Sequence, residues 1–396
     1  MSYSIKSLVI FLIASTLLCR VSSIGTRDAI AFWGGIQSVI HGGNPYDQNL
    51  VLRYQQEIYP DKTEPQYFLN PPWAIPVLLV FFSPPFEIAR ILLMTVSLLI
   101  IAYTILFLRE CFGGLSQVGL VVFALSTPFL ATIWCGQLSA LILLGFILIL
   151  KEFNRASPRA EWLAIGIILL AVKPQTTYLL IIATCILALR TRRPYFASYM
   201  IIGLGALLIA AFWVPDLITG WSSTFSYSTL WRTASVVTYI RSSLMHWGFS
   251  DQWLLWGIPL STTLALMTYC LGLKSVEAPQ SLFLLIALIS ALTAPYIWIY
   301  DLIILSPHLY LILRTAQDAR VSRAYRGSLM TCALCAACPV YALFSQSFEI
   351  FVVYSGVILI GWLFRYSALK CISYQARCAR GEKRRKRAIH GPFPHR

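Results

Sequence analysis

Charged residues are scarce in this sequence. They make up 12% of its 396 residues, whereas hydrophobic residues make up 58%; a soluble domain usually carries about 25% charged residues. A single soluble core could not bury this much apolar surface, but a bilayer can solvate the outer faces of a helical bundle. The composition therefore excludes a soluble globular protein and predicts an integral membrane protein.

Acidic residues are scarcer than basic ones, 16 against 31, which gives a net charge of +15. Such an excess can indicate nucleic-acid binding. Here the basic residues lie in short loops between apolar runs and in a C-terminal tail, as the positive-inside rule describes. We therefore predict no nucleic-acid binding, and a disordered cytoplasmic tail, residues 371–396, in contact with anionic lipids.

Metal-ligand spacing is lacking as well. His41 has no second His or Cys at ligand spacing. Cys332, Cys335 and Cys338 are regularly spaced, but they lie in an apolar run of small residues, which is typical of helix packing in membranes. We therefore predict no metal and no other cofactor.

Long apolar runs are abundant and predict an all-α polytopic membrane protein with about twelve transmembrane helices, in one domain over residues 1–370. Some runs are shorter than the roughly 20 residues of a perpendicular span. Both termini are expected in the cytoplasm, because this orientation places most basic residues inside. The proline-rich segment 71–85 is expected to be re-entrant or interfacial. The runs are about 5–24, 86–108, 115–132, 136–150, 161–173, 174–190, 195–213, 253–273, 280–296, 298–314, 327–345 and 349–369.

Two large loops then face outward, at about 25–85 and 214–252, and loops of this length are usually functional. In the first, Asp28 lies near the end of a span, where a carboxylate can act as a general base or simply cap the next helix. The second is rich in aromatic residues that suit either the membrane interface or a sugar ring. Its Arg232 and Arg241 are candidates for binding phosphate.

Four polar residues interrupt the later apolar runs. Lys173 could neutralise a phosphate, or its ammonium group could extend to the membrane surface. Gln137 and Gln175 could orient a ligand hydroxyl or form hydrogen bonds across helices. Asp301 could assist proton transfer, or pair with Lys173 or Arg232 as a structural ion pair.

The order of several motifs resembles glycosyltransferase family 87, a membrane family of the GT-C fold, and in particular its mannosyltransferases that use polyprenyl phosphate mannose. The resemblance covers about residues 5–195. Its motifs are Asp28, Trp33, Gly43-Asn44-Pro45-Tyr46-Asp47, Tyr67-Phe68-Leu69-Asn70-Pro71-Pro72, Gly136-Gln137-Leu138-Ser139 and Lys173-Pro174-Gln175.

The resemblance implies a multi-pass enzyme of the cell membrane that transfers a hexose, mannose in the first place, with inversion. The donor would be a polyprenyl-phosphate sugar and the acceptor a glycolipid or glycan on the extracytoplasmic side. Asp28 would be the catalytic base; Lys173, Arg232 and Arg241 would bind the donor phosphate. Substrate-binding candidates are Asn44, Tyr46, Asp47, Gln137, Gln175, Tyr300 and Asp301. The alternatives are a polytopic transporter, for which clear internal repeats are lacking, or a lipid-linked glycan flippase or polymerase.

Overall fold

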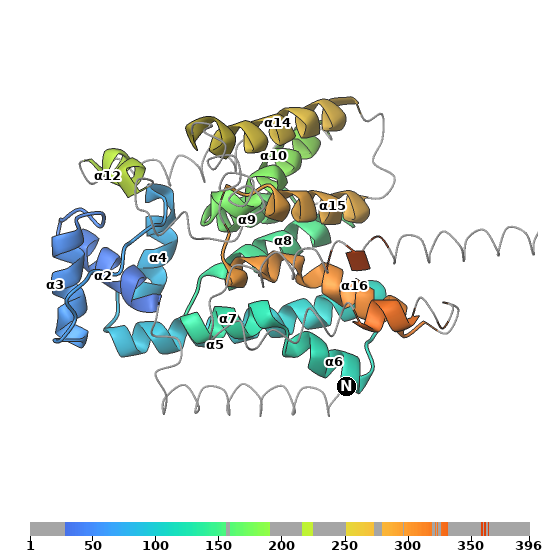
Figure 1. The fold of residues 1–396 in the computed structure, drawn as a ribbon, viewed down its shortest axis with the longest axis horizontal. Coiled ribbons are helices and arrows are strands. Elements are labelled where there is room, and N and C mark those ends of the chain that lie inside the picture. The colour runs from blue at the N-terminus through green and yellow to red at the C-terminus, as the bar shows by residue number, and fades with distance from the viewer. Residues whose placement is uncertain are drawn as a thin grey trace, which may run out of the picture.

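The computed structural model describes residues 28–155, 159–190, 216–224, 251–272, 279–295, 297–318 and 326–331, with a few scattered residues besides. All regular elements in these ranges are helices (Figure 1), which confirms the all-α class. They are α2 (Ala29–Ile40), α3 (Gln48–Ile58), η1 (Pro72–Ala74), α4 (Ile75–Phe82), α5 (Phe86–Phe112), α6 (Gln117–Ala124), α7 (Thr127–Cys135), α8 (Ser139–Phe153), α9 (Ala160–Ala171), α10 (Pro174–Arg190), α12 (Leu217–Thr224), α14 (Asp251–Gly272), α15 (Pro279–Leu292), η3 (Ile299–Leu305) and α16 (Ser306–Ala316).

Only part of the predicted topology can be compared with the structure. By length and composition, α5 and the combined helix Ile299–Ala316 can cross a membrane, and α6 with α7 adds a third span if the bent pair counts as one. The first predicted span, the cysteine-rich run and the basic tail lie outside the described residues, as does most of the second outer loop. The count of twelve spans and the two outer loops therefore stay predictions.

The run at 115–132, predicted as one span, is instead broken into α6 and α7, which are bent by 42°. Ser126 is the N-cap of α7, and Pro128 occupies its first turn. Because proline has no backbone N–H and its ring clashes with the preceding turn, α6 cannot continue through this point. The run therefore forms a bent helix pair, and its crossing of the membrane as one span stays a prediction.

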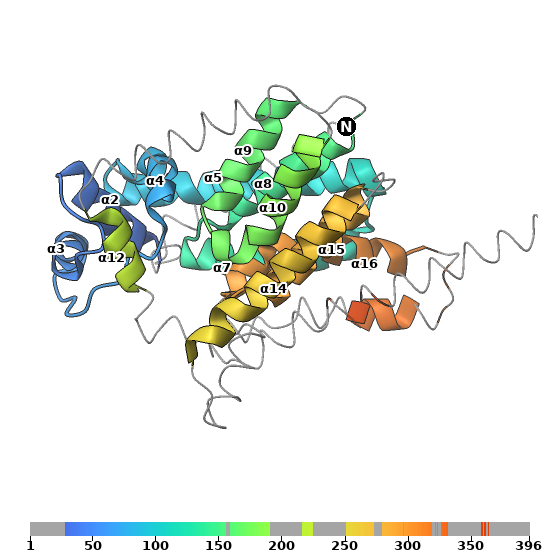
Figure 2. The same cartoon turned by 90° about the horizontal axis from the view of Figure 1, so that it is seen from above.

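The helices α2, α3, α4 and α12 gather at one end of the bundle (Figures 1 and 2). The indole N–H of Trp73, in η1, donates to the carbonyl oxygen of Ala171 at the end of α9, over 2.9 Å. The ring of Trp73 also packs edge-on against Trp221 of α12. The segment that carries Trp73 is thereby attached to the end of the bundle where α9 stops.

The helices α8 and α9 approach each other closely in the middle of the bundle, where both carry a glycine. A Cβ atom on Gly145 would lie 2.6 Å from the carbonyl oxygen of Gly166. Small residues at such a crossing let two helix backbones come into contact. The α9–α10 pair is separated at Lys173, because Pro174 begins a new helix and cannot donate a backbone hydrogen bond to the old one.

Candidate active site

Asp28 stands at the N-cap position of α2, but its side chain does not cap the helix. One carboxylate oxygen accepts a hydrogen bond of 2.9 Å from the side-chain amide of Gln66, and the other accepts one of 2.5 Å from the amide of Gln137. Its backbone N–H donates to the carbonyl oxygen of Cys135 at the end of α7. The residue as a whole is partly exposed. Asp28 therefore does not cap α2 with its side chain. Hydrogen bonds from residues distant in the sequence fix its carboxylate instead.

Gln137 connects Asp28 to the interior of the bundle. Its amide nitrogen donates to Asp28, and its amide oxygen accepts a hydrogen bond of 2.7 Å from the ammonium group of Lys173. The residue follows the left-handed Gly136, which ends α7, and its side chain is almost fully buried. Because both ends of the amide have partners of opposite character, its orientation is fixed by this network.

Lys173 forms a buried ion pair with Asp301 of η3. The ammonium nitrogen lies 2.7 Å from a carboxylate oxygen of Asp301 and 3.1 Å from the hydroxyl of Ser139, and 4.5 Å from the centre of the Tyr300 ring. Lys173 is 6% exposed and Asp301 is fully buried. The structure therefore confirms the alternative in which Asp301 pairs with Lys173, and it excludes a lysine whose ammonium group extends to the membrane surface.

Asp301 has further partners that fix its position. The Ser139 hydroxyl donates to the same carboxylate oxygen over 2.7 Å, and the backbone N–H of Trp298 lies 3.3 Å from the other oxygen. Buried charges are tolerated when they are both paired and hydrogen-bonded. One connected polar network therefore runs from Gln66 through Asp28, Gln137 and Lys173 to Asp301.

The motif at residues 43–47 forms a turn and a helix cap. The Asn44 side chain accepts a hydrogen bond from the backbone N–H of Tyr46, and Asp47 caps α3 by accepting from Asn49 and Leu50. The Tyr46 hydroxyl donates to the carbonyl oxygen of Asn70 over 2.6 Å, and burial raises the pKa of this phenol well above its usual range. These contacts join the turn to the segment that carries Gln66.

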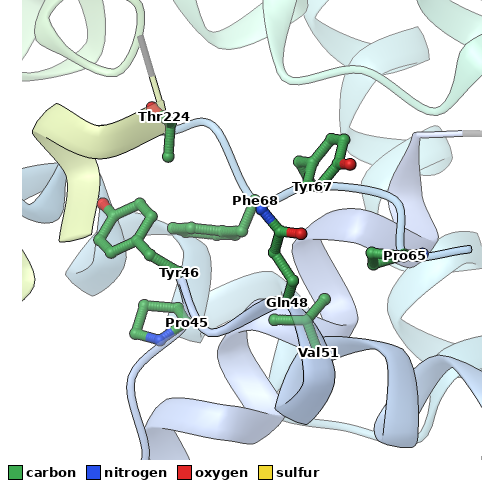
Figure 3. A pocket seen from close by; sticks show the side chains of 8 residues that line it. All are labelled: Pro45, Tyr46, Gln48, Val51, Pro65, Tyr67, Phe68 and Thr224. Atoms are coloured by element: carbon green, nitrogen blue, oxygen red, sulfur yellow. The ribbon is translucent and has the colours of Figure 1, made fainter. Parts of the chain in front are cut away.

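Tyr46 also lines a small pocket with Phe68 and Thr224 (Figure 3). Its volume is only about 10 Å³, which is about the space that one water molecule needs. A sugar ring does not fit there. The substrate-binding roles predicted for Asn44, Tyr46 and Asp47 stay predictions, while their observed contacts are those of a scaffold for the loop.

The other predicted site residues are separate from this network or lie outside the described residues. Gln175 is partly buried in the first turn of α10, and within the described ranges no hydrogen bond joins it to Lys173 or Gln137. Arg232 and Arg241 are not among the residues that the structure describes. In the described part of the chain no three metal-binding side chains lie together; the absence of a metal stays a prediction.

Sequence analysis missed Gln66 as a member of this site. It directly precedes the aromatic stretch that leads to the Pro-Pro pair, and its own backbone is held by two hydrogen bonds to the side-chain amide of Gln55 in α3. A polar residue next to a recognised motif was the only signal that could have pointed to it.

The model of glycosyltransferase family 87 matches residues 68–298, more than half of the chain. The chain belongs to glycosyltransferase family 87. No curated protein and no solved structure matched it. Family 87 membership confirms the predicted resemblance and makes this protein a membrane glycosyltransferase, which favours the enzyme over the transporter alternative.

The range that matches family 87 contains the central part of the polar network, namely Gln137, Ser139 and Lys173. Asp28 and Asp301, the two carboxylates of the network, lie on either side of the matched range. Their assignment to the site therefore depends on the geometry described above.

Proposed function

We propose that this family 87 enzyme transfers a hexose from a polyprenyl-phosphate sugar to a hydroxyl of a glycolipid or glycan, with mannose as the first candidate for the hexose. The transfer would take place on the extracytoplasmic side of the cell membrane. The observation that carries the proposal is the placement of Asp28, a partly exposed residue whose side chain leaves its helix uncapped and is held by two amides instead.

The chemistry of an inverting transfer explains why such a carboxylate is needed. The acceptor oxygen attacks the anomeric carbon on the face opposite the phosphate, and Asp28 takes the proton of the acceptor hydroxyl. The bond from the anomeric carbon to the phosphate oxygen breaks, and the polyprenyl phosphate leaves with the electron pair. A positioned base contributes typically 10²–10⁴-fold to the rate of such a step.

Gln66 and Gln137 serve as positioning residues in this proposal, because each fixes one oxygen of Asp28. A catalytic group must be held within a fraction of an ångström of its productive position, and packing with hydrogen bonds from neighbours provides this. The buried ion pair of Lys173 and Asp301 in turn fixes the amide of Gln137.

The leaving phosphate requires a cation, since charge accumulates on it as the bond breaks. Lys173 remains our candidate together with Arg232 and Arg241. Gln137, Ser139 and Asp301 accept three hydrogen bonds from its ammonium group, and an ammonium group has only three hydrogens to donate. Lys173 would therefore have to exchange one of these bonds for a phosphate oxygen when the donor binds.

The decisive experiment compares Asp28→Asn with Asp61→Asn in the purified full chain. Asparagine keeps the shape of the carboxylate but cannot take the proton. Asp61 is an exposed acid of the same outer loop, away from the network, and so provides the matched control. Transfer of radiolabelled mannose from mannosyl phosphoryl polyprenol to a glycolipid extract would be measured in detergent.

We expect Asp28→Asn to lower kcat by about 10²–10⁴-fold, with elution from a sizing column unchanged, and Asp61→Asn to keep wild-type transfer. Near-normal transfer by Asp28→Asn would remove Asp28 as the base and direct attention to the second outer loop. Transfer of a sugar other than mannose, tested with a panel of polyprenyl-phosphate sugars, would overturn the choice of mannose but leave Asp28 in place.

A further inference from the structure

A second cavity lies at the other end of the α8–α9 pair. It has a volume of about 520 Å³ and lies between α5, α8 and α9, which is within the usual range for ligand-binding pockets. At 1.5 Å per residue, the 12 steps from Ser139 to Lys151 place the charged end of this cavity about 18 Å along α8 from the polar network. The cavity is therefore separate from the candidate active site.

Three cationic side chains line one end of this cavity, namely Lys151, Arg155 and Arg159. The single acid that lines it, Glu152, is 2% exposed and is already neutralised: one oxygen lies 2.8 Å from the guanidinium group of Arg155, and the other accepts from the backbone N–H of Arg159. The rim therefore keeps an excess of positive charge, provided by Lys151 and Arg159.

Two aromatic residues stand beside these cations. The ammonium group of Lys151 lies 3.0 Å from the Tyr103 hydroxyl and 5.5 Å from the centre of its ring. Trp162, on the first turn of α9, lines the cavity and is 39% exposed. Tyrosine and tryptophan next to Lys and Arg are typical of the headgroup level of a membrane.

The remaining lining is apolar and extends along the helices toward the middle of the bundle, through Leu148, Leu144 and Ile165. The seven residues from Leu144 to Lys151 extend about 10 Å along α8. A ligand that fits this lining has an anionic group at one end and hydrocarbon at the other. A free phosphate ion would use only the rim and leave the apolar walls in contact with water.

We propose that this groove binds one anionic glycerophospholipid. Its phosphate would contact Lys151 and Arg159, and the upper part of an acyl chain would lie against Leu144, Leu148 and Ile165. The positive-inside pattern predicts this end of the helices on the cytoplasmic side, where anionic lipids give the leaflet its negative surface potential. The site is independent of the basic tail and of the sugar-transfer reaction.

The test is native mass spectrometry of the purified full chain with dioleoyl phosphatidylglycerol or dioleoyl phosphatidylcholine. The principal variant is the double change Lys151→Gln/Arg159→Gln, which keeps the ion pair between Arg155 and Glu152. The matched control is Arg53→Gln/Lys62→Gln, two basic residues of the first outer loop. The tail is present in every protein, so its contribution is the same in all of them.

We expect the wild type to bind phosphatidylglycerol more tightly than phosphatidylcholine. The Lys151/Arg159 variant should bind phosphatidylglycerol about 30-fold more weakly, as the loss of two cations near a charged surface predicts, and the Arg53/Lys62 control should bind like the wild type. Equal binding of phosphatidylglycerol by wild type and Lys151/Arg159 variant would overturn the proposal and assign the lipid to another surface.

A second variant tests the apolar wall without touching the charges. Ile165 is 39% exposed, so Ile165→Trp fills the groove while leaving the core intact. It should lower phosphatidylglycerol binding even though both cations remain. Unchanged binding, or displacement of the lipid from the wild type by inorganic phosphate alone, would overturn the groove as a lipid site.

Discussion

The ion pair between Lys173 and Asp301 should have a large effect on stability when it is broken from one side. Asp301 is fully buried and Lys173 is 6% exposed, so removing either charge leaves the other uncompensated in a medium of low dielectric. Breaking a buried pair in this way costs about 3–5 kcal/mol. We therefore expect Asp301→Asn and Lys173→Met each to destabilise the protein by about this amount.

The double variant Lys173→Met/Asp301→Asn should be more stable than either single variant. It contains no buried charge at the pair, and the amide oxygen that replaces one carboxylate oxygen can still accept one of the two hydrogen bonds, from Ser139 or from the backbone N–H of Trp298. Replacement of a whole buried pair is often nearly neutral, and we expect a cost below about 2 kcal/mol. The double-mutant cycle should then give a coupling energy of several kcal/mol.

Thermal unfolding in detergent measures this cycle. At about 2 °C per kcal/mol, the low end of the range for domains of 150–250 residues, each single variant should lower Tm by about 6–10 °C. The exposed Asp61→Asn provides the control and should stay within about 1 °C of the wild type, because surface changes usually cost less than about 0.5 kcal/mol. Additive losses in the double variant would refute the reasoning, since they would show that the two charges do not interact.

Three further predictions concern other parts of the structure. Gly145→Ala should destabilise the protein by about 1–3 kcal/mol, because its Cβ would lie 2.6 Å from a backbone oxygen of α9. Gly257→Ala is the control, since a Cβ atom there would meet open space. Thermal unfolding of the two variants should show a lower Tm for Gly145→Ala alone. Tyr46→Phe should cost about 1–3 kcal/mol by leaving the Asn70 carbonyl unpaired. Since burial raises the pKa of Tyr46 in the folded state, the wild type should lose this advantage as the pH rises above about 10, the pKa of an unfolded tyrosine; a difference in Tm that is constant with pH would contradict this. Lys173→Met should raise the donor KM and leave the acceptor KM unchanged if the lysine binds the phosphate; a lower kcat with both KM values unchanged would reduce it to a positioning residue.

Local signals in the sequence predicted part of the fold. The largely apolar run at 86–108 became α5, since it contains no proline or glycine to interrupt a helix. Pro174 correctly separated two helices, because a proline blocks continuation wherever it stands. The same rule accounts for the bend at Pro128 between α6 and α7, which the hydropathy of the run at 115–132 does not indicate.

The candidate site was less accessible to sequence reasoning. The sequence predicts Asp28 near a membrane boundary, but whether it caps a helix or serves as a functional group depends on where its side chain points. That direction is set by Gln66 and Gln137, which are 38 and 109 residues away in the chain. Contacts at such separations arise from packing of the whole bundle, and no local pattern encodes them. The pairing of Lys173 with Asp301 could be named only as one of several possibilities.

The shortness of α8 and α9 has a consequence for the surrounding lipid. Their 15 and 12 residues extend about 22 and 18 Å, against about 30 Å for the hydrocarbon layer. If Lys151 and Arg159 are anchored among headgroups on one side, Ser139 and Lys173 lie about 10 Å below the headgroups on the other. If both helices cross the membrane as predicted, thinning of the bilayer around the pair would remove this hydrophobic mismatch. Activity after reconstitution should then depend on acyl-chain length, with shorter chains bringing the phosphate of the proposed lipid-linked donor closer to the Asp28 carboxylate.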